Sequence, residues 1–244
     1  MNYITPWQNT IEYTNLHGVS SVKIKNLVNI ANKENYYGVC IPPGSVPVAS
    51  KYRNQDLKII TVAGFPPIHK WLLYRDNKDP RLNFYLGHYT KQEIDKIKYI
   101  LDNPDVDELD LVFPMLWYAS GKFARISTFF KGIKQRFKRP IKVITELGTI
   151  FKDPISLFEI VDLLEQSGVD FFKTNTGLIP CDFNLTSTGI QLVKKLKPNI
   201  RIKASGGIRT LSQVKFLMSL GVERIGTSNL INDIPNTAPM TGQL

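Results

Sequence analysis

Short apolar runs rich in β-branched residues alternate with longer amphipathic stretches along most of the chain. Runs of this kind favour strands, whereas apolar residues that recur three and four positions apart indicate helices. The pattern predicts strands at Ile11–Asn15, Tyr37–Pro42, Lys58–Gly64, Glu108–Phe113, Lys142–Leu147, Asp170–Thr174, Arg201–Ser205 and Arg224–Thr227. It predicts helices at Val22–Lys33, Gln92–Leu101, Ser156–Gln166, Thr188–Leu196 and Leu211–Leu220. Gly168 and Gly221 each follow a helical pattern, where a left-handed cap is expected.

The alternation of strands and helices predicts an α/β fold with a parallel sheet, because consecutive parallel strands need a crossover connection. Eight strands in 244 residues favour closure into a (β/α)8 TIM barrel over an open sheet. We expect one domain over residues 1–244, with an N-terminal extension before the first strand. Residues 67–84 follow the third strand and are expected to form an inserted loop or lid at the active-site rim. Residues 234–244 are expected to form a tail.

The composition is that of an ordinary globular protein, with 43% hydrophobic and 21% charged residues. No apolar run approaches the roughly 18 residues that span a bilayer. The first residues lack the basic start and apolar stretch of a secretory signal. Two cysteines, Cys40 and Cys181, are too few for a disulfide framework. We therefore expect a cytoplasmic protein with no membrane partner.

The net charge of +10 at pH 7 is compatible with nucleic acid, an anionic membrane surface or phosphorylated substrates as partners. The densest basic run is Lys131, Lys134, Arg136, Lys138 and Arg139. This run falls on a predicted surface helix whose buried stripe is Phe130, Ile133 and Phe137, so a solvated helix face is the favoured interpretation. Zinc-ligand spacing and nucleic-acid-binding motifs are absent from the sequence. We expect no nucleic-acid partner.

Three charged residues stand where barrel strands are predicted to point inward or to end. Lys173 ends the run from Asp170, Lys203 lies in the seventh strand, and Asp110 lies in the fourth. An ionised group in an apolar interior is costly unless it is paired, so these positions need a chemical reason. A second ammonium about 4 Å away raises the energy of a lysine cation by roughly 4 kcal/mol at an effective dielectric of about 20. Adjacent lysines are therefore typical of a nucleophilic, imine-forming lysine, with Asp110 as its partner in proton transfer.

The structural alternative is an ion cluster of the two lysines and Asp110 that only orders the barrel interior. Both lysines precede glycine-containing turns rather than standing in mid-strand, which favours the chemical interpretation.

Glycine turns follow the seventh and eighth strands, at Gly206-Gly207-Ile208-Arg209 and Gly226-Thr227-Ser228-Asn229. In a TIM barrel, the loops after these two strands commonly form a phosphate site. Glycine lets backbone N–H groups approach an anion, and Ser205, Ser228 and Arg209 add donors. The sequence therefore predicts a phosphate-binding end to the site.

The two lysine segments, Phe172-Lys-Thr-Asn-Thr-Gly177 and Lys203-Ala-Ser-Gly-Gly-Ile-Arg-Thr210, resemble the lysine motifs of the deoxyribose-phosphate aldolase family. Further similarity lies at the other predicted strand ends: Val39-Cys-Ile-Pro-Pro43, Val62-Ala-Gly-Phe-Pro66, Glu108-Leu-Asp-Leu-Val-Phe-Pro114, Lys142-Val-Ile-Thr-Glu-Leu-Gly148 and Arg224-Ile-Gly-Thr-Ser228. The resemblance runs in matching order from about Ile11 to Asn229. The two lysine motifs together are specific, whereas either one alone is not.

The resemblance implies a class I aldolase that reversibly cleaves 2-deoxy-D-ribose 5-phosphate to acetaldehyde and D-glyceraldehyde 3-phosphate, in deoxynucleotide breakdown. Lys173 would form the Schiff base, Lys203 would ease its deprotonation, and Asp110 would relay protons with Lys203 through water. The implied substrate or phosphate contacts are Thr174, Gly177, Ser205, Gly206, Gly207, Arg209, Gly226 and Ser228. Cys40 matches a family cysteine near the site. No metal or other cofactor is implied, since the imine is the electron sink, and a homodimer is expected by analogy.

The chain departs from the family pattern in its first strand, where Glu12-Tyr13-Thr14 replaces Asp-His-Thr. Glu12 and Thr14 are therefore candidate site-lining residues whose recognition of the sugar hydroxyls differs. Asn229 and Leu178 also stand where polar residues are common in the family. These departures leave open a related Schiff-base aldolase with another donor or phosphosugar, and a non-catalytic phosphosugar-binding barrel.

Lys142 and Glu146 alternate with Ile144 on the predicted fifth strand, so both are expected to face the barrel interior. The family shares this lysine and glutamate. A direct role in the site and an internal ion pair both remain open for them.

Overall fold

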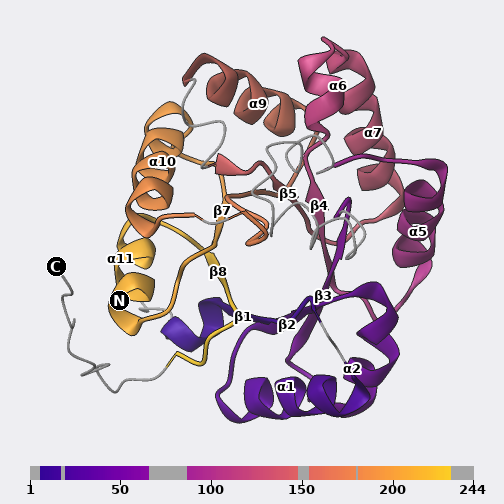
Figure 1. Cartoon of the computed structure of the whole chain (residues 1–244), viewed down its shortest axis with the longest axis vertical. Coiled ribbons are helices and arrows are strands. Elements are labelled where there is room, and N and C mark those ends of the chain that lie inside the picture. Colours follow the sequence, from indigo (N-terminus) through magenta and orange to yellow (C-terminus); the bar gives the residue numbers. More distant parts are fainter. Residues whose placement is uncertain (1–5, 18–19, 66–86, 148–153, 180, 232–244) are drawn as a thin grey trace, which may run out of the picture.

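Eight parallel strands close into one barrel in the order of the chain, which confirms the predicted (β/α)8 fold. The computed structural model describes residues 6–17, 20–65, 87–147, 154–179 and 181–231. The strands occupy the centre of Figure 1 and the helices surround them. Their bounds are β1 Ile11–Thr14, β2 Gly38–Ile41, β3 Lys58–Ala63, β4 Glu108–Val112, β5 Ile141–Ile144, β6 Phe171–Lys173, β7 Ile202–Ser205 and β8 Arg224–Thr227.

The outer ring consists of helices that follow the strands. The described helices are α1 Ser21–Lys33, α2 Val46–Tyr52, α5 Lys91–Asp102, α6 Met115–Ala119, α7 Phe123–Arg136, α9 Pro154–Gln166, α10 Phe183–Leu196 and α11 Leu211–Ser219. Short 3-10 turns lie at η1 Trp7–Thr10 and η2 Pro43–Ser45. Turn η1 belongs to the predicted N-terminal extension, and its Trp7 ring packs 6.3 Å from the ring of Tyr36.

Most predicted helices agree with the structure to within two residues at each end, but α10 begins five residues earlier than expected. Its start is fixed by Asp182, whose carboxylate accepts hydrogen bonds from the N–H groups of Asn184 and Leu185. The apolar spacing did not predict α2 or α6, because each spans two turns or fewer and shows no clear period. The expected left-handed caps are confirmed, with φ of 74° at Gly168 and 78° at Gly221.

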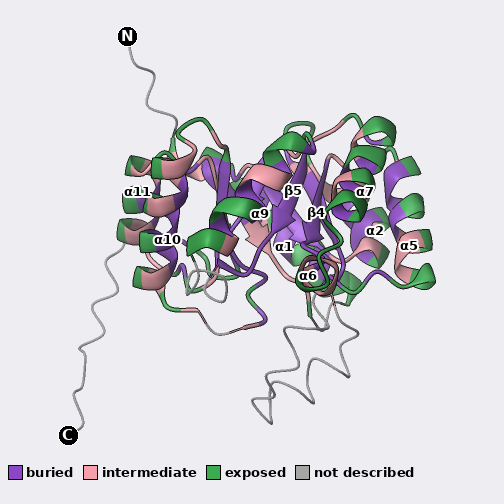
Figure 2. Ribbon diagram, turned by 90° about the horizontal axis from the view of Figure 1, so that it is seen from above, coloured by how far each residue is buried: buried purple, intermediate pink, exposed green. Residues whose placement is uncertain are grey.

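The strands are buried on both faces, as Figure 2 shows for the centre of the molecule. In β4, Leu109 and Leu111 belong to the large apolar core, while Glu108 and Asp110 alternate with them. Alternation with period two therefore directs the apolar side chains outward against the helices and the charged ones into the barrel interior. Every residue of β4 is buried, so the charged side chains are enclosed by protein rather than by solvent.

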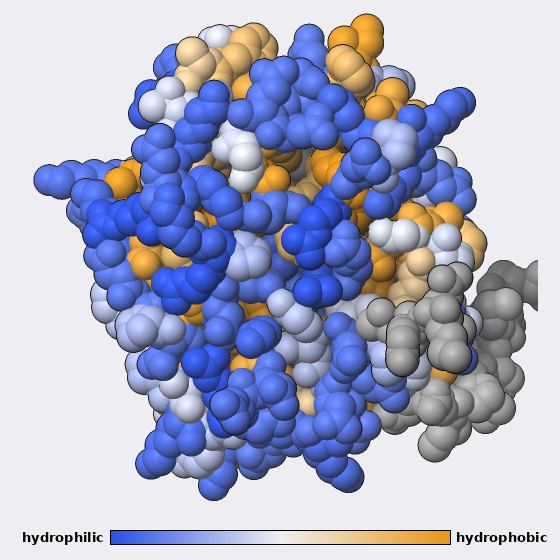
Figure 3. Space-filling view, turned by 180° about the vertical axis from the view of Figure 1, so that it is seen from behind, coloured by the Kyte–Doolittle hydropathy of each residue, from blue (hydrophilic) through white to orange (hydrophobic). Residues whose placement is uncertain are grey.

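The basic run on and after α7 makes contacts within the chain. Lys134 forms an ion pair with Asp170, and Arg136 pairs with Asp102. The guanidinium group of Arg139 donates to carbonyl oxygens at the end of α5 and just after it, including those of Leu101 and Asn103. These contacts agree with a solvated, locally paired surface. Figure 3 shows the face opposite to that of Figure 1, and hydrophilic residues cover most of it.

The predicted insertion at 67–84 and the predicted tail at 234–244 lie outside the described residues. Among the helices that the structure describes, none combines the length and the apolar character that crossing a bilayer would require.

Replacement of Phe130 by alanine tests the apolar layer between α7 and the barrel. The ring is fully buried, so Phe130→Ala should lower the free energy of unfolding by about 3–5 kcal/mol in urea denaturation. Lys131→Ala, one residue along the same helix and exposed, should change it by no more than about 0.5 kcal/mol. Equal effects of the two substitutions would contradict the assigned face of the helix.

Candidate active site

Strand register brings the predicted catalytic residues together inside the barrel. Lys173 on β6 lies directly opposite Lys203 on β7, so the two lysines stand at the same height, as the sequence predicted. Asp110 on β4 lies opposite Lys142 on β5. Because these strands are adjacent around the barrel, all four side chains enter the same part of the interior.

The carboxylate of Asp110 is the meeting point of three lysines. Its Oδ2 atom lies 2.7 Å from the Nζ atom of Lys203 and 2.8 Å from that of Lys173. Its Oδ1 atom lies 3.2 Å from the Nζ atom of Lys142. The side chain of Asp110 is completely buried, so these ammonium groups replace the solvation that the carboxylate loses.

Two further carboxylates balance the charge of the lysines. Glu12 on β1 lies 3.2 Å from the Nζ atom of Lys142 and also forms an ion pair with Lys203. Glu108 lies two residues before Asp110 on β4. It pairs with Lys142 and accepts a hydrogen bond from the hydroxyl of Tyr37. We call the six residues Glu12, Glu108, Asp110, Lys142, Lys173 and Lys203 the interior charge cluster.

The interior charge cluster fixes the protonation of its members. Burial opposes ionisation of Asp110, but Lys142, Lys173 and Lys203 outweigh it and hold its pKa well below the usual range. Burial likewise opposes charge on Lys203, yet Asp110 and Glu12 raise its pKa above the ordinary value. Asp110 and Lys203 are therefore an ionised pair across the neutral pH range.

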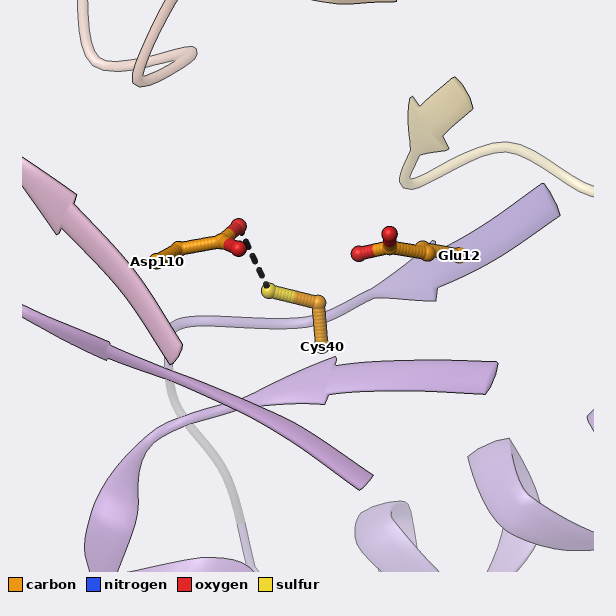
Figure 4. Close-up of side chains that lie close together, drawn as sticks. All are labelled: Glu12, Cys40 and Asp110. Carbon is orange, nitrogen blue, oxygen red and sulfur yellow. Dashed lines mark hydrogen bonds between the residues drawn. The ribbon is translucent and has the colours of Figure 1, made fainter. Parts of the chain in front are cut away.

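Cys40 on β2 lies beside this cluster. Figure 4 shows its thiol and the carboxylates of Glu12 and Asp110 directed toward one another, and Sγ lies 3.8 Å from Oδ2 of Asp110. Burial raises the pKa of the Cys40 thiol to about 11, so it is a neutral thiol at pH 7. Ligand atoms of these three residues lie within 4.8 Å of one another, a spacing that suits a metal ion. However, both carboxylates already form ion pairs with lysine ammonium groups, so their negative charge is neutralised without a metal ion.

A cavity of about 600 Å³ opens above the interior charge cluster. Among its described lining residues, Lys173 is the one member of the cluster that it reaches. Lys142 and Lys203 are completely buried, whereas the Lys173 side chain is 4% exposed. The structure therefore gives a substrate access to Lys173 and seals the other two lysines beneath it.

Most residues predicted to contact substrate or phosphate line this cavity: Gly177, Ser205, Gly206, Gly207, Arg209, Gly226 and Ser228. Thr14, predicted to line the site, does so as well. At two of these positions, the local geometry explains why the residue is glycine. Gly207 has a φ of 73°, and a Cβ atom there would lie 2.9 Å from the carbonyl oxygen of Cys181. A Cβ atom at Gly226 would lie 3.2 Å from Cε of Lys203, so glycine leaves room for that lysine.

Other predicted residues lie behind the cavity wall. Thr174 is buried and exchanges hydrogen bonds with the backbone of Ser205, at 2.9 Å in each direction, so it joins the β6 and β7 loops. Glu12, predicted to line the site, is completely buried in the interior charge cluster. Leu178 packs with Val112 and Ile144 in a small apolar cluster.

The prediction for Lys142 is met in that it faces the interior, where it forms ion pairs. The prediction for Glu146 as a strand residue is wrong, because β5 ends at Ile144. Glu146 instead adopts a left-handed backbone conformation, with a φ of 53°.

Several lining residues were not singled out from the sequence. Thr176, Leu16 and His17 are among the residues that line the cavity. Each lies within four residues of a predicted strand end, which is the one signal that would have indicated them.

No protein-family model matches the chain. Individual relatives do match over nearly its whole length. The deoxyribose-phosphate aldolase of Mycoplasmoides pirum is 31% identical over 242 residues, covering 97% of this chain and 98% of the relative. The deoxyribose-phosphate aldolase of Clostridioides difficile is 29% identical over 231 residues, covering 93% and 94%.

Solved structures agree with these relatives. One described as QR15, an aldolase, superimposes with a TM-score of 0.75 at 25% identity and covers 92% of each chain. A deoxyribose phosphate aldolase from Aeropyrum pernix, described as having a unique tetrameric structure, shares the fold with a TM-score of 0.71 at 23% identity, covering 91% of this chain and 86% of that one. The relatives, together with the barrel and its buried lysine pair, show that the chain belongs to the deoxyribose-phosphate aldolase family and is an aldolase.

Proposed function

We propose that the chain reversibly cleaves 2-deoxy-D-ribose 5-phosphate to acetaldehyde and D-glyceraldehyde 3-phosphate through a Schiff base on Lys173. One observation carries the proposal: a lysine at the floor of the cavity shares a carboxylate oxygen of Asp110 with a second, sealed lysine. The names of the relatives supply the substrate, a phosphorylated deoxysugar.

The nucleophile must be a neutral amine. Lys203 stays protonated because Asp110 and Glu12 hold its charge. Lys203 shares an oxygen of Asp110 with Lys173, so Asp110 keeps a counter-ion when Lys173 reacts as a neutral amine. Attack of the Lys173 amine on the sugar aldehyde, followed by uptake of one proton and loss of water, gives a protonated imine.

The imine cation then withdraws electrons while the carbon–carbon bond breaks. A base removes the proton of the C3 hydroxyl, glyceraldehyde 3-phosphate leaves, and the two-carbon fragment remains on Lys173 as an enamine. Protonation of the enamine carbon and hydrolysis release acetaldehyde and regenerate the amine. We assign these proton transfers to Asp110 and Lys203 acting through a water molecule, since both lie immediately beneath Lys173.

The phosphate end of the substrate fits the side of the cavity formed by the β7 and β8 loops. Gly206, Gly207, Gly226 and Ser228 provide backbone there, and Arg209 supplies positive charge. Cytoplasmic location and a homodimer stay predictions.

A related Schiff-base aldolase with another donor or phosphosugar is the first alternative. Tyr13 and Asn229, two departures from the family pattern, line the cavity, so substrate scope depends on them. Retro-aldol rates on several sugar phosphates separate the two proposals. Ligand binding without any turnover would instead favour the non-catalytic barrel.

Borohydride trapping is the direct test of the imine. Incubation with acetaldehyde followed by reduction should add one fragment, mapped by peptide mass to Lys173. Lys173→Leu should lose both the adduct and turnover, whereas Lys215→Leu on the exposed face of α11 should keep both. An adduct on another lysine of a folded wild-type protein would contradict the assignment.

Replacement of the shared carboxylate separates imine formation from proton transfer. Asp110→Asn should lower kcat for retro-aldol cleavage by about 10²–10⁴-fold, because a positioned acid–base group contributes about that much. The trapped adduct on Lys173 should still form over long incubation. Asp162→Asn, on the surface of α9, is the matched control and should leave kcat unchanged. Wild-type kcat in folded Asp110→Asn would remove Asp110 from the mechanism.

Loss of the cavity-lining guanidinium tests the phosphate site. Arg209→Ala should raise KM for deoxyribose 5-phosphate roughly five- to tenfold, the equivalent of about 1 kcal/mol for a partly exposed charge pair. KM for unphosphorylated deoxyribose should not change. Arg201→Ala, at the other end of the β7 region and paired with Glu223, is the control and should affect neither substrate. A rise in both KM values would place Arg209 outside phosphate recognition.

A further inference from the structure

Glu146 is a buried carboxylic acid whose role the interior charge cluster does not explain. It lies just beyond the end of β5, is 6% exposed, and has a φ of 53°. Residues other than glycine, asparagine and aspartate seldom adopt this left-handed conformation, because the Cβ atom crowds the backbone. The surrounding structure must therefore hold the residue in this conformation.

The cause is a bulge between β5 and the residues that follow β6. The N–H of Thr145 donates to the carbonyl of Lys173 at 3.1 Å, and the N–H of Leu147 donates to the carbonyl of Thr174 at 2.8 Å. Donors two residues apart thus meet acceptors only one residue apart, so Glu146 is an extra residue on its side. Bulges of this kind redirect a side chain and are common beside active sites.

The redirected carboxylate holds the loop after β6. Oε1 of Glu146 accepts a hydrogen bond from the backbone N–H of Thr176. The Thr176 hydroxyl in turn accepts from the N–H of Leu178 at 3.1 Å, and Gly177 has a φ of 79°. Thr176 and Gly177 line the cavity, whereas Glu146 is not among its described lining residues. The carboxylate therefore supports the cavity wall from behind.

We propose that Glu146 is a positioning residue: its carboxylate fixes the Thr176–Gly177 wall, three residues after Lys173, in the conformation that receives the phosphorylated substrate. This role rests on the proposed function of the cavity. Glu146 acts through Thr176 and takes no part in the chemical step.

The same carboxylate is sensitive to pH in the neutral range. Burial raises its pKa to about 7, against the opposing effects of the Thr176 hydrogen bonds and the positive charge of Lys173. The facing titratable groups are Lys173 on β6 and the Cys181 thiol before α10. Since the folded-state pKa lies above the ordinary value of 4.5, the stability from this group is complete below pH 4.5 and is lost as pH rises through about 7. Ionisation strengthens the hydrogen bond to Thr176, so substrate binding should improve over the same range.

Two variants separate acceptance of the hydrogen bond from ionisation. Glu146→Ala removes the acceptor and should raise KM for deoxyribose 5-phosphate at pH 8 by about tenfold or more, the scale of one hydrogen bond to a charged group. Its rate of adduct formation with acetaldehyde at Lys173 should stay within about threefold of the wild type. Glu146→Gln keeps an oxygen acceptor but carries no charge, so its KM at pH 8 should lie near the wild-type value at pH 6 and below that of Glu146→Ala. Its KM should not vary between pH 6 and 8, whereas the wild-type KM falls. Glu165→Ala, on the outer side of α9, is the matched control and should behave as wild type.

Several outcomes would overturn the role. One is folded Glu146→Ala with wild-type KM; another is a parallel loss of adduct formation, which would place Glu146 in the chemistry. If Glu146→Ala does not fold by circular dichroism, Glu146→Gln decides, and a wild-type pH profile of KM in that variant refutes the proposal. Absence of cleavage and adduct in the wild-type protein would sink the proposed function instead. In that case the Thr176–Gly177 wall is tested by the thermal shift that inorganic phosphate produces. An equal rise in Tm for wild type and Glu146→Gln across pH 6–8 refutes the positioning role.

Discussion

The rest of the site depends on one constraint: an ionised lysine inside a protein must be paired with a carboxylate. The barrel interior places Lys142, Lys173 and Lys203 around Asp110, with Glu12 and Glu108 as the remaining counter-ions. The numbers of cations and anions are equal, so the interior charge cluster is neutral when every member is ionised. A neutral Lys173, the nucleophile of the proposed mechanism, would leave one negative charge in excess. In the proposed mechanism, formation of the protonated imine would restore neutrality, and the cluster would then stabilise the cationic intermediate more than the free amine.

The parallel barrel makes this arrangement possible. Adjacent strands in register put Lys173 and Lys203 side by side, and the period of two keeps them inside while apolar neighbours such as Phe172 and Ala204 join the outer core. The cavity then selects between the two lysines by access alone, because it reaches Lys173 and not Lys203. Glycine at position 226 leaves room for the buried Lys203, since any larger side chain would crowd the methylene groups of that lysine.

The sequence predicted the barrel and the inward-facing charges at its strand ends well, because both depend on local period and on short motifs. Lys173, Lys203 and Asp110 were identified as inward-facing charges at strand positions, and the structure brings them into contact. The second carboxylate partner of Lys203 was not predictable in the same way: Glu12 lies 191 residues away and was assigned to the cavity lining. Glu146 was placed on β5 by extrapolating an alternation that the bulge interrupts at Ile144. Local patterns thus predict which side chains point inward, whereas the contacts between distant strands require the closed barrel.

In the proposed function, chemistry and recognition lie in different parts of the barrel, so the chain can depart from its family at the cavity wall and keep its lysines. The interior charge cluster lies below the cavity and includes Glu12 from β1, which is a counter-ion to Lys203. Tyr13 and Asn229 change the cavity wall instead. A carboxylate whose charge is already shared by Lys142 and Lys203 has little remaining capacity to bind a sugar hydroxyl. If the proposed function holds, hydroxyl recognition would come from the rim residues, and specificity could change there while the imine chemistry is retained.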